Sequence, residues 1–216
     1  MFFIHHTNIV KNSLFALRIN FEDNGFTLFP DVFFLKHPGT SSWFRPSDIY
    51  SKKLDPEVVS WLHDQGSLTR RLMEFCPRQF SVRVLSQQWV KPEIDEARLL
   101  NIPHRQLALL RQVQLLCGET VCVYARSVIP LKTLKGRHRR LQFLGDRPLG
   151  AYLFSNPGLR RTRQQLASIA HKDALFEIAM SGSDLSCEKI WGRRSLFSID
   201  DKPLLVSEFF LPALFE

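Results

Sequence analysis

The chain has 216 residues, of which 44% are hydrophobic and 23% are charged, with 12 prolines and 10 glycines. This composition is that of an ordinary globular protein, and it excludes collagen-like, low-complexity and wholly disordered chains. A chain of this length buries roughly 70% of the surface that it exposes when unfolded, so its fold requires neither disulfides nor a metal. No stretch approaches the ~18 consecutive apolar residues of a membrane span, and the N-terminus lacks the features of a signal peptide. We therefore expect a soluble cytoplasmic protein that is not inserted in a membrane.

The cysteines stand at Cys76, Cys117, Cys122 and Cys187, and no two of them form a Cys-x-x-Cys pair. No histidine pair has the spacing of a zinc finger either. Metal sites and redox motifs of these kinds have characteristic short spacings. The sequence therefore predicts four reduced thiols and no metal site.

The net charge of +8 is unevenly distributed. Residues 131–163 contain nine Lys or Arg side chains and one acid, Asp146. Such a field attracts anions, from nucleic acid to small metabolites. Aromatic residues do not alternate with the basic ones, and no helix-turn-helix, RNA-recognition or zinc-finger signature occurs, so we favour a solvated face over a nucleic-acid surface.

The predicted organisation is an N-terminal extension of uncertain structure over residues 1–45, which holds nine of the 18 phenylalanines, followed by one domain over residues 46–216. In that domain Asp55-Pro56 marks a helix start, and Ser67 offers a cap for a second helix over Leu68–Phe75. Residues 80–89, 106–116 and 120–129 alternate as strands, the last two joined by a short glycine-containing hairpin.

Further along the chain, Pro148–Phe154 and Leu159–Met180 are predicted as helices, the second from a stripe at Leu166, Ile169 and Ala170. Two extended runs, Ser195–Ile199 and Leu204–Leu211, end the chain. Hairpin-linked strands with helices between them indicate an α+β fold with an antiparallel sheet.

Two of the predicted strands carry a charge on an apolar face. Residues i, i+2 and i+4 of a strand share a face, so Arg111 falls among leucines and valine, and Glu208 falls among Leu204, Val206 and Phe210. A buried charge without a partner costs several kcal/mol. Either the two residues pair with each other, or both line a cavity where Arg111 binds a carboxylate and Glu208 meets a hydroxyl or ether oxygen.

Six segments, in this order, resemble the chorismate lyase family, whose members act in ubiquinone biosynthesis in proteobacteria. The likeness runs from about Trp43 to Glu216, and it is carried by Trp61–Arg71, Leu110–Val113, Arg126–Pro130 with Leu134 and Gly136, Leu144–Phe154, Trp191–Ser195 and Lys202–Pro212. The resemblance implies a single α+β domain with a six-stranded antiparallel sheet and an internal active site closed by helical flaps.

The resemblance also implies site residues. The ligand-binding arginine and glutamate of the family correspond to Arg111 and Glu208, the two residues already singled out by strand alternation. A backbone-binding leucine corresponds to Leu149, and a flap residue, often Met in the family, corresponds to Leu68. Residues 176–189 form an insertion relative to the family, which we expect to lengthen a helix or loop near the pocket.

The implied reaction removes the enolpyruvyl group of chorismate as pyruvate and leaves 4-hydroxybenzoate, without a cofactor. In this hypothesis Arg111 binds the ring carboxylate, and Glu208, kept protonated by its apolar surroundings, is the general acid at the ether oxygen. Arg193 and Arg194 are either solvated charges or contacts to the second carboxylate, and Arg126 is left open. The expected partner is the small-molecule substrate alone, bound by a monomer. The alternative is a non-catalytic aromatic-acid binding protein or effector-sensing domain of the same fold.

Overall fold

The computed structural model describes residues 21–22, 25–26 and 43–216, and the chain divides into two units, residues 1–36 and 37–216. The predicted extension over residues 1–45 lies mostly outside the described residues. In the first unit, strand β1 (Phe21–Glu22) pairs antiparallel with β2 (Gly25–Phe26). The second unit contains all the other elements.

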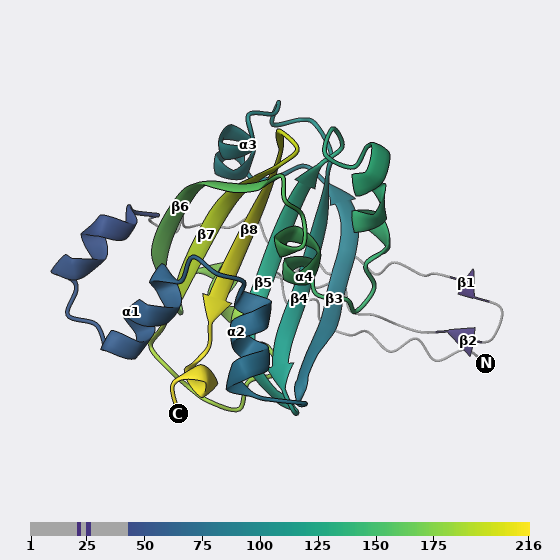
Figure 1. Cartoon of the computed structure of the whole chain (residues 1–216). Coiled ribbons are helices and arrows are strands. Elements are labelled where there is room, and N and C mark those ends of the chain that lie inside the picture. The colour runs from purple at the N-terminus through teal and green to yellow at the C-terminus, as the bar shows by residue number, and fades with distance from the viewer. Residues whose placement is uncertain (1–20, 23–24, 27–42) are drawn as a thin grey trace, which may run out of the picture. The chain divides into compact units, whose positions relative to one another are not determined.

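The second unit is built on a six-stranded antiparallel sheet with the strand order β3-β4-β5-β8-β7-β6 (Figure 1). The first three strands run in hairpin order, and so do the last three, with β5 and β8 joining the two halves. The strands are β3 (Phe80–Val90), β4 (Ala108–Cys117), β5 (Thr120–Pro130), β6 (Leu159–Ala170), β7 (Lys189–Ile199) and β8 (Lys202–Phe210). The predicted α+β fold is confirmed.

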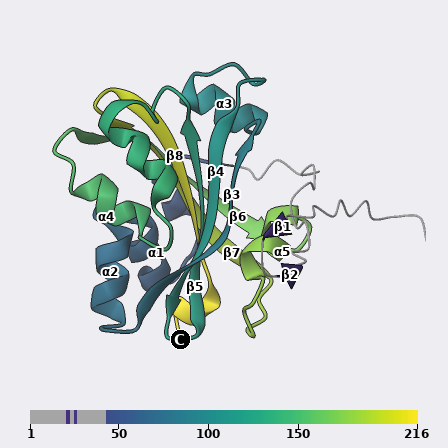
Figure 2. The same cartoon turned by 90° about the vertical axis from the view of Figure 1, so that its right-hand side faces the viewer.

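Both faces of the sheet are covered, which is why nearly every residue of the central strands β4 and β5 is buried (Figure 2). One face, called the inner face here, packs against α1 (Pro56–His63), α2 (Leu68–Phe75), α4 (Leu149–Phe154) and the 3-10 helix η2 (Gly136–Phe143). The outer face packs against α3 (Ile94–Leu100) and α5 (Ala174–Met180). Short 3-10 helices η1 (Pro46–Ser51) and η3 (Pro212–Leu214) complete the unit.

The helix starts follow from local chemistry. The Asp55 side chain accepts a hydrogen bond from the Glu57 backbone N–H, with Pro56 as the first helical residue of α1. Ser67 caps α2 in the same way through the Arg70 N–H. The two helices predicted from these signals are confirmed with their first residues.

The long helix predicted over Leu159–Met180 is wrong in its first half, because residues 159–170 form strand β6 and only Ala174–Met180 is helical. Leu166 packs into the inner core, whereas Ala167 and Ile169 pack into the outer core. With apolar residues required on both faces, this part of the strand loses the alternation that identifies a half-buried strand. Its apolar residues then fall by coincidence at helical spacing.

The expected place of the insertion over residues 176–189 is also wrong. Most of α5 belongs to this segment, and Phe176 and Ala179 pack on the outer face of the sheet. None of its residues lines the inner-face cavity described below. The helical part of this segment therefore adds to the layer on the outer face.

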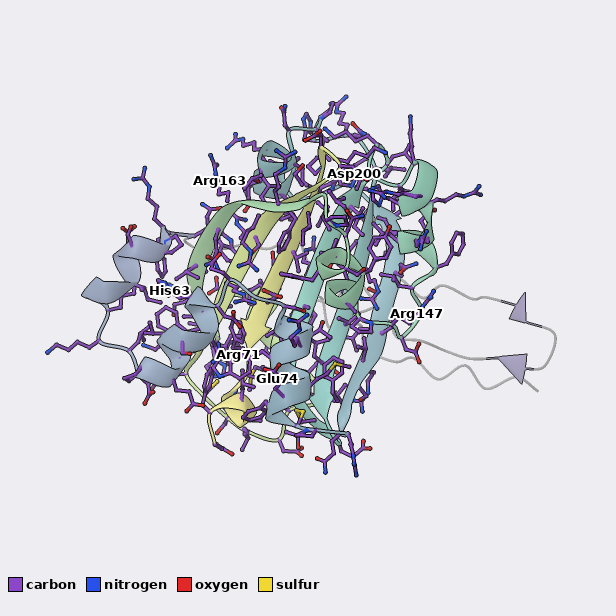
Figure 3. The ribbon with its side chains drawn as sticks, viewed as in Figure 1. His63, Arg71, Glu74, Arg147, Arg163 and Asp200 are labelled. Carbon is purple, nitrogen blue, oxygen red and sulfur yellow. A yellow bond between two sulfur atoms is a disulfide. The ribbon has the colours of Figure 1, made fainter. Side chains whose placement is uncertain are left out.

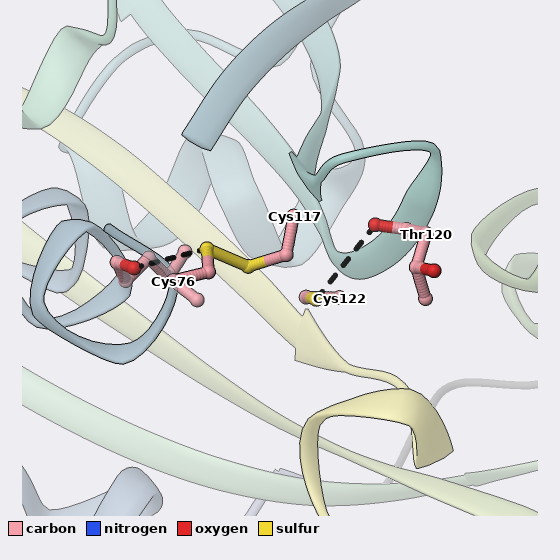
Figure 4. Close-up of a disulfide and its surroundings, with 5 residues drawn as sticks. Cys76, Cys117, Thr120 and Cys122 are labelled. Atoms are coloured by element: carbon pink, nitrogen blue, oxygen red, sulfur yellow. Dashed lines mark hydrogen bonds between the residues drawn. A yellow bond between two sulfur atoms is a disulfide. The ribbon is translucent and has the colours of Figure 1, made fainter. Parts of the chain in front are cut away.

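The expectation of four reduced thiols is corrected by a disulfide between Cys76 and Cys117 (Figure 4). Cys76 directly follows α2, and Cys117 ends β4, where it pairs with Phe80 at the start of β3. The fold thus brings together two residues 41 positions apart, and their Cα atoms lie 5.7 Å from each other. Cys122 and Cys187 are free.

Candidate active site

A cavity lies between the inner face of the sheet and the pair α2 and α4, which stand side by side in front of the sheet in Figure 1. Its roof is formed by the start of α2, with Leu68 and Thr69, and by α4, with Leu149 and Gly150. Its floor carries side chains of five neighbouring strands, among them Arg111, Ser127, Glu208, Phe197 and Arg161. The four residues predicted for the site, Leu68, Arg111, Leu149 and Glu208, therefore line one cavity.

Arg111 enters this cavity from β4 and is 1% exposed. Its Nη2 donates hydrogen bonds to the carbonyl oxygens of Gly145, at 2.9 Å, and Arg147, at 3.1 Å. Its Nε has no hydrogen-bond partner among the described residues, and no described carboxylate pairs with it. Burial lowers the pKa of Arg111 to about 10, so the side chain remains a cation at neutral pH.

Glu208 enters from β8 and forms an ion pair with Arg193 of the adjacent strand β7, with Arg193 Nε 2.6 Å from Glu208 Oε2. The two residues face each other in the register of these strands. Arg193 is fully buried, and its Nη1 also donates to the carbonyl oxygens of Trp61 and Asp64. Glu208 therefore accepts a charge-assisted hydrogen bond from a buried cation.

The suggested ion pair between Arg111 and Glu208 is wrong, and the register explains why. Arg111 is opposite Ser127 on β5, whereas Glu208 is opposite Ala125, two residues away and one strand further on. With strands about 4.8 Å apart and a rise of about 3.3 Å per residue, the two Cα atoms are about 12 Å apart. The floor therefore presents a cation and a carboxylate at separate places, each with a face toward the cavity.

The roof is closely packed where its two helices meet. A Cβ atom added to Gly150 would lie 2.5 Å from Oγ1 of Thr69, a distance that real Cβ atoms do not adopt. Glycine at this position therefore lets α4 approach α2, and it brings the backbone of Leu149 over the cavity. Arg71 of α2, labelled in Figure 3, holds α1 beside it, since its guanidinium donates to Ser60 and stacks 3.7 Å from the Trp61 ring centre. It also pairs with Asp64 in the loop between the two helices.

The other arginines considered in the sequence have structural partners. Arg194 and Arg126 lie on the outer face, where they pair with Asp95 and Glu96 of α3. Neither is a solvated charge, and neither contacts the cavity. Arg193 is not a solvated charge either, because it is fully buried. Sequence reasoning had no means to assign these partners, because α3 itself was not predicted.

Arg161 is the charged residue of the cavity lining that sequence reasoning missed. It lies on β6, the strand predicted as a helix, and its guanidinium lies 5.1 Å from the centre of the Phe197 ring. Burial, followed by the nearby Arg193 charge, lowers its pKa. Assigning β6 as a strand would not have been enough to place Arg161, because strict alternation from Leu166 puts it on the outer face. A register shift between Arg161 and Arg163 turns it to the inner face, two strands from Glu208.

Over the described part of the chain, no three His, Cys, Asp or Glu side chains are grouped as metal ligands would be. No helix in that part has both the length and the apolar character required to cross a membrane.

Known proteins match most of the chain. The family model described as chorismate lyase matches residues 37–216. A probable chorismate pyruvate-lyase from Methylococcus capsulatus is 46% identical over 157 residues, which cover 73% of this chain and 96% of the relative. Another from Nitrosospira multiformis is 37% identical over 163 residues, covering 76% and 91%.

Solved structures resemble the fold at much lower identity. The crystal structure of PhnF from Mycobacterium smegmatis superimposes with a TM-score of 0.50 at 15% identity, covering 70% of this chain and 66% of that one. At this identity the likeness concerns the architecture of the sheet and helices alone.

Proposed function

The chain belongs to the chorismate lyase family, and from this membership we propose that it is a chorismate pyruvate-lyase, which converts chorismate into 4-hydroxybenzoate and pyruvate. One observation supports this most strongly: a buried cavity holds an arginine without a counter-ion and, at a separate place, a carboxylate. Such a cavity suits an anionic ring that carries a hydroxyl or ether group.

In this proposal Arg111 binds the ring carboxylate. Its side chain is fixed by two backbone carbonyls and keeps a buried N–H without a partner among the described residues. Leaving such a donor unsatisfied is costly, and a carboxylate offers a charge-assisted hydrogen bond. Leu68 and Leu149 cover the ring from the roof, and the family resemblance implies that Leu149 binds through its backbone.

Glu208 is the proton-transfer residue of the proposed reaction. It is the single carboxyl group lining the cavity in the described part of the chain. The C3–O bond of chorismate breaks and its electron pair leaves on the oxygen, which gives the enolate of pyruvate, while the electron pair of the C4–H bond forms the last aromatic double bond. The Glu208 carboxylate accepts the C4 proton and returns it to the methylene carbon, which becomes the methyl group of pyruvate. The general acid predicted from the sequence thus arises during the reaction, because the resting residue is paired with Arg193.

The remaining features of the proposal follow from this chemistry. The elimination is neither an oxidation nor a reduction, so it calls for no redox cofactor. The basic field over residues 131–163 raises the local concentration of the dianionic substrate. The cavity holds the substrate in a reactive shape, which removes much of the entropic cost of reaction. We propose that the enzyme acts as a cytoplasmic monomer, without nucleic-acid partners, at the first committed step of ubiquinone biosynthesis.

The activity is tested by adding the purified protein to chorismate and following 4-hydroxybenzoate by its absorbance. A stable complex with 4-hydroxybenzoate but no turnover of chorismate would support instead a non-catalytic aromatic-acid binding protein. If the protein neither converts chorismate nor binds 4-hydroxybenzoate, both assignments are overturned.

A further inference from the structure

The buried and half-buried arginines on the strands of the sheet fall into two groups. Three are paired with carboxylates: Arg126 with Glu96, Arg193 with Glu208 and Arg194 with Asp95. Arg111 and Arg161 form no ion pair with any described residue, and these two are the arginines that line the cavity. Buried cations are normally paired, so two exceptions facing one cavity indicate that the cavity receives two anionic groups.

Arg161 is held in place by neutral acceptors of the loop between α1 and α2. Its Nη1 donates to the Asp64 carbonyl at 3.1 Å and to the Gln65 side chain at 2.9 Å, and its Nη2 donates to the Gly66 carbonyl. These contacts fix the guanidinium without neutralising it. Its Nε is buried and has no hydrogen-bond partner among the described residues.

The position of Arg161 relative to Glu208 is set by a shared acceptor. Arg193, the partner of Glu208, donates to the same Asp64 carbonyl as Arg161, at 2.8 Å. The guanidinium of Arg161 therefore lies beside the Glu208–Arg193 pair. Arg111 enters from β4, on the other side of Glu208, since β5, β8 and β7 separate β4 from β6. The cavity floor thus presents a cation, a carboxylate and a second cation in this order.

We propose that Arg161 binds the carboxylate of the enolpyruvyl group of chorismate, an assignment that rests on the proposed function. Chorismate has two carboxylates on either side of the bond that breaks, and the floor has two unpaired cations on either side of the proton-transfer carboxylate. The product 4-hydroxybenzoate retains only the ring carboxylate. Arg161 therefore recognises the substrate and the departing pyruvate but not the aromatic product, whereas Arg111 recognises both substrate and product.

The experiment compares two ligands in one variant. Arg161→Gln removes the charge but keeps a hydrogen-bond donor for the loop. The KM for chorismate is expected to rise on the order of tenfold to a hundredfold, the factor that hydrogen bonds to charged groups contribute. The Kd for 4-hydroxybenzoate, measured by calorimetry, is expected to stay within about twofold, and this binding also shows that the cavity is folded. Arg163→Gln is the matched control, because Arg163 is an exposed arginine on the same strand (Figure 3).

The possible results separate the explanations. If Arg161 only fastens the loop over the cavity, Arg161→Gln weakens chorismate and 4-hydroxybenzoate alike, and the proposal is overturned. An unchanged KM in a variant that binds the product normally overturns it as well. If the wild-type protein leaves chorismate intact, the proposed function itself is overturned. If the wild type converts chorismate and Arg161→Gln has no effect, only the role of Arg161 is overturned. A selective rise in the KM for chorismate, absent in Arg163→Gln, supports the proposal.

Discussion

Glu208 is paired with Arg193 of the neighbouring strand, at 2.6 Å, and this leaves Arg111 as an unpaired cation in the same cavity. The pairing fixes the position of the carboxylate through a charge-assisted hydrogen bond. It also separates the roles of the two residues. Because Arg111 is not paired with Glu208, a substitution of Glu208 removes no contact of Arg111. Substitutions at the two positions should therefore have different effects.

Arg111→Ala should weaken the binding of 4-hydroxybenzoate on the order of a hundredfold, because it removes the charged donor to the ring carboxylate in a desolvated cavity. Calorimetric titration of the product measures this directly. Arg139→Ala, which removes an exposed charge from the basic field, is the control for general electrostatics. Equal product affinity in Arg111→Ala and wild type would show that Arg111 does not bind the carboxylate.

Glu208→Gln keeps the shape of the side chain and an oxygen that accepts from Arg193, but it cannot carry a proton between carbon atoms. We expect kcat to fall on the order of a hundredfold or more, with 4-hydroxybenzoate binding little changed. Single-turnover kinetics with chorismate separates the chemical step from product release. If kcat stays within several-fold of wild type, the proton passes within the substrate itself and Glu208 only orients it.

Reduction of the Cys76–Cys117 disulfide should lower the free energy of unfolding by about 2–4 kcal/mol, since the bond closes a long loop in the unfolded chain. Denaturant unfolding with and without dithiothreitol measures the difference. The double variant Cys76→Ser/Cys117→Ser should be insensitive to the reductant, and Cys187→Ser should respond as wild type does, because Cys187 is free. Four titratable thiols in the unreduced, denatured protein would contradict the disulfide.

Gly150→Ala should force α2 and α4 apart, because the added Cβ lies 2.5 Å from Oγ1 of Thr69. The overlap is expected to cost about 1–3 kcal/mol of stability and to lower kcat/KM through a displaced roof. Thermal unfolding and chorismate turnover are measured together. The double variant Gly150→Ala/Thr69→Ala removes the obstructing hydroxyl and should recover most of both losses. A double variant as impaired as the single one would place the cause elsewhere.

Asp200, in the turn between β7 and β8, should give the fold a pH-dependent stability. Hydrogen bonds from Arg137 and then from His138 hold the pKa of its carboxyl below the ordinary 3.8. A lowered pKa stabilises the fold above the unfolded-state value, and the contribution is lost as the pH falls through the folded-state value. Asp200→Asn should therefore lower Tm at neutral pH, with a difference that shrinks below pH 3.8.

The neighbouring residue provides the control for this effect. Asp201 also has a positive φ, of 60° against 48° for Asp200, so asparagine suits both backbones. Its ion pair with Arg160 is exposed, and such pairs contribute little. Asp201→Asn should leave Tm nearly unchanged from pH 3.8 upward. If Asp201→Asn lowers Tm as much as Asp200→Asn does, the effect comes from the turn itself and not from the contact of Asp200 with the buried His138.

Much of the site could be predicted from the sequence because strands β4 and β8 obey a simple alternation. Their periodicity alone placed Arg111 and Glu208 on apolar faces, and the cap at Ser67 gave the first residue of the roof helix α2. These signals are local, so each could be read without knowledge of strand order. The resemblance to the family added Leu68 and Leu149, which the structure brings to the same cavity.

The rest depends on long-range pairing that local patterns do not contain. The partner of Glu208 is set by the register between β7 and β8. Arg161 reaches the cavity because β6 pairs with β7 and a register shift between Arg161 and Arg163 turns it to the inner face. The period of β6 is obscured because both of its faces are covered near Leu166. Cys76 and Cys117 are likewise brought together by the fold and not by their spacing.

The most direct test of the central claim is to quantify both products formed from chorismate by wild type and by Arg111→Ala under the same conditions. The account predicts that wild type forms 4-hydroxybenzoate and pyruvate in equal amounts. It predicts that Arg111→Ala has a kcat/KM lower on the order of a hundredfold, as expected when a charged contact to the substrate is lost. Absence of either product with wild type, or equal activity of the two proteins, would contradict it.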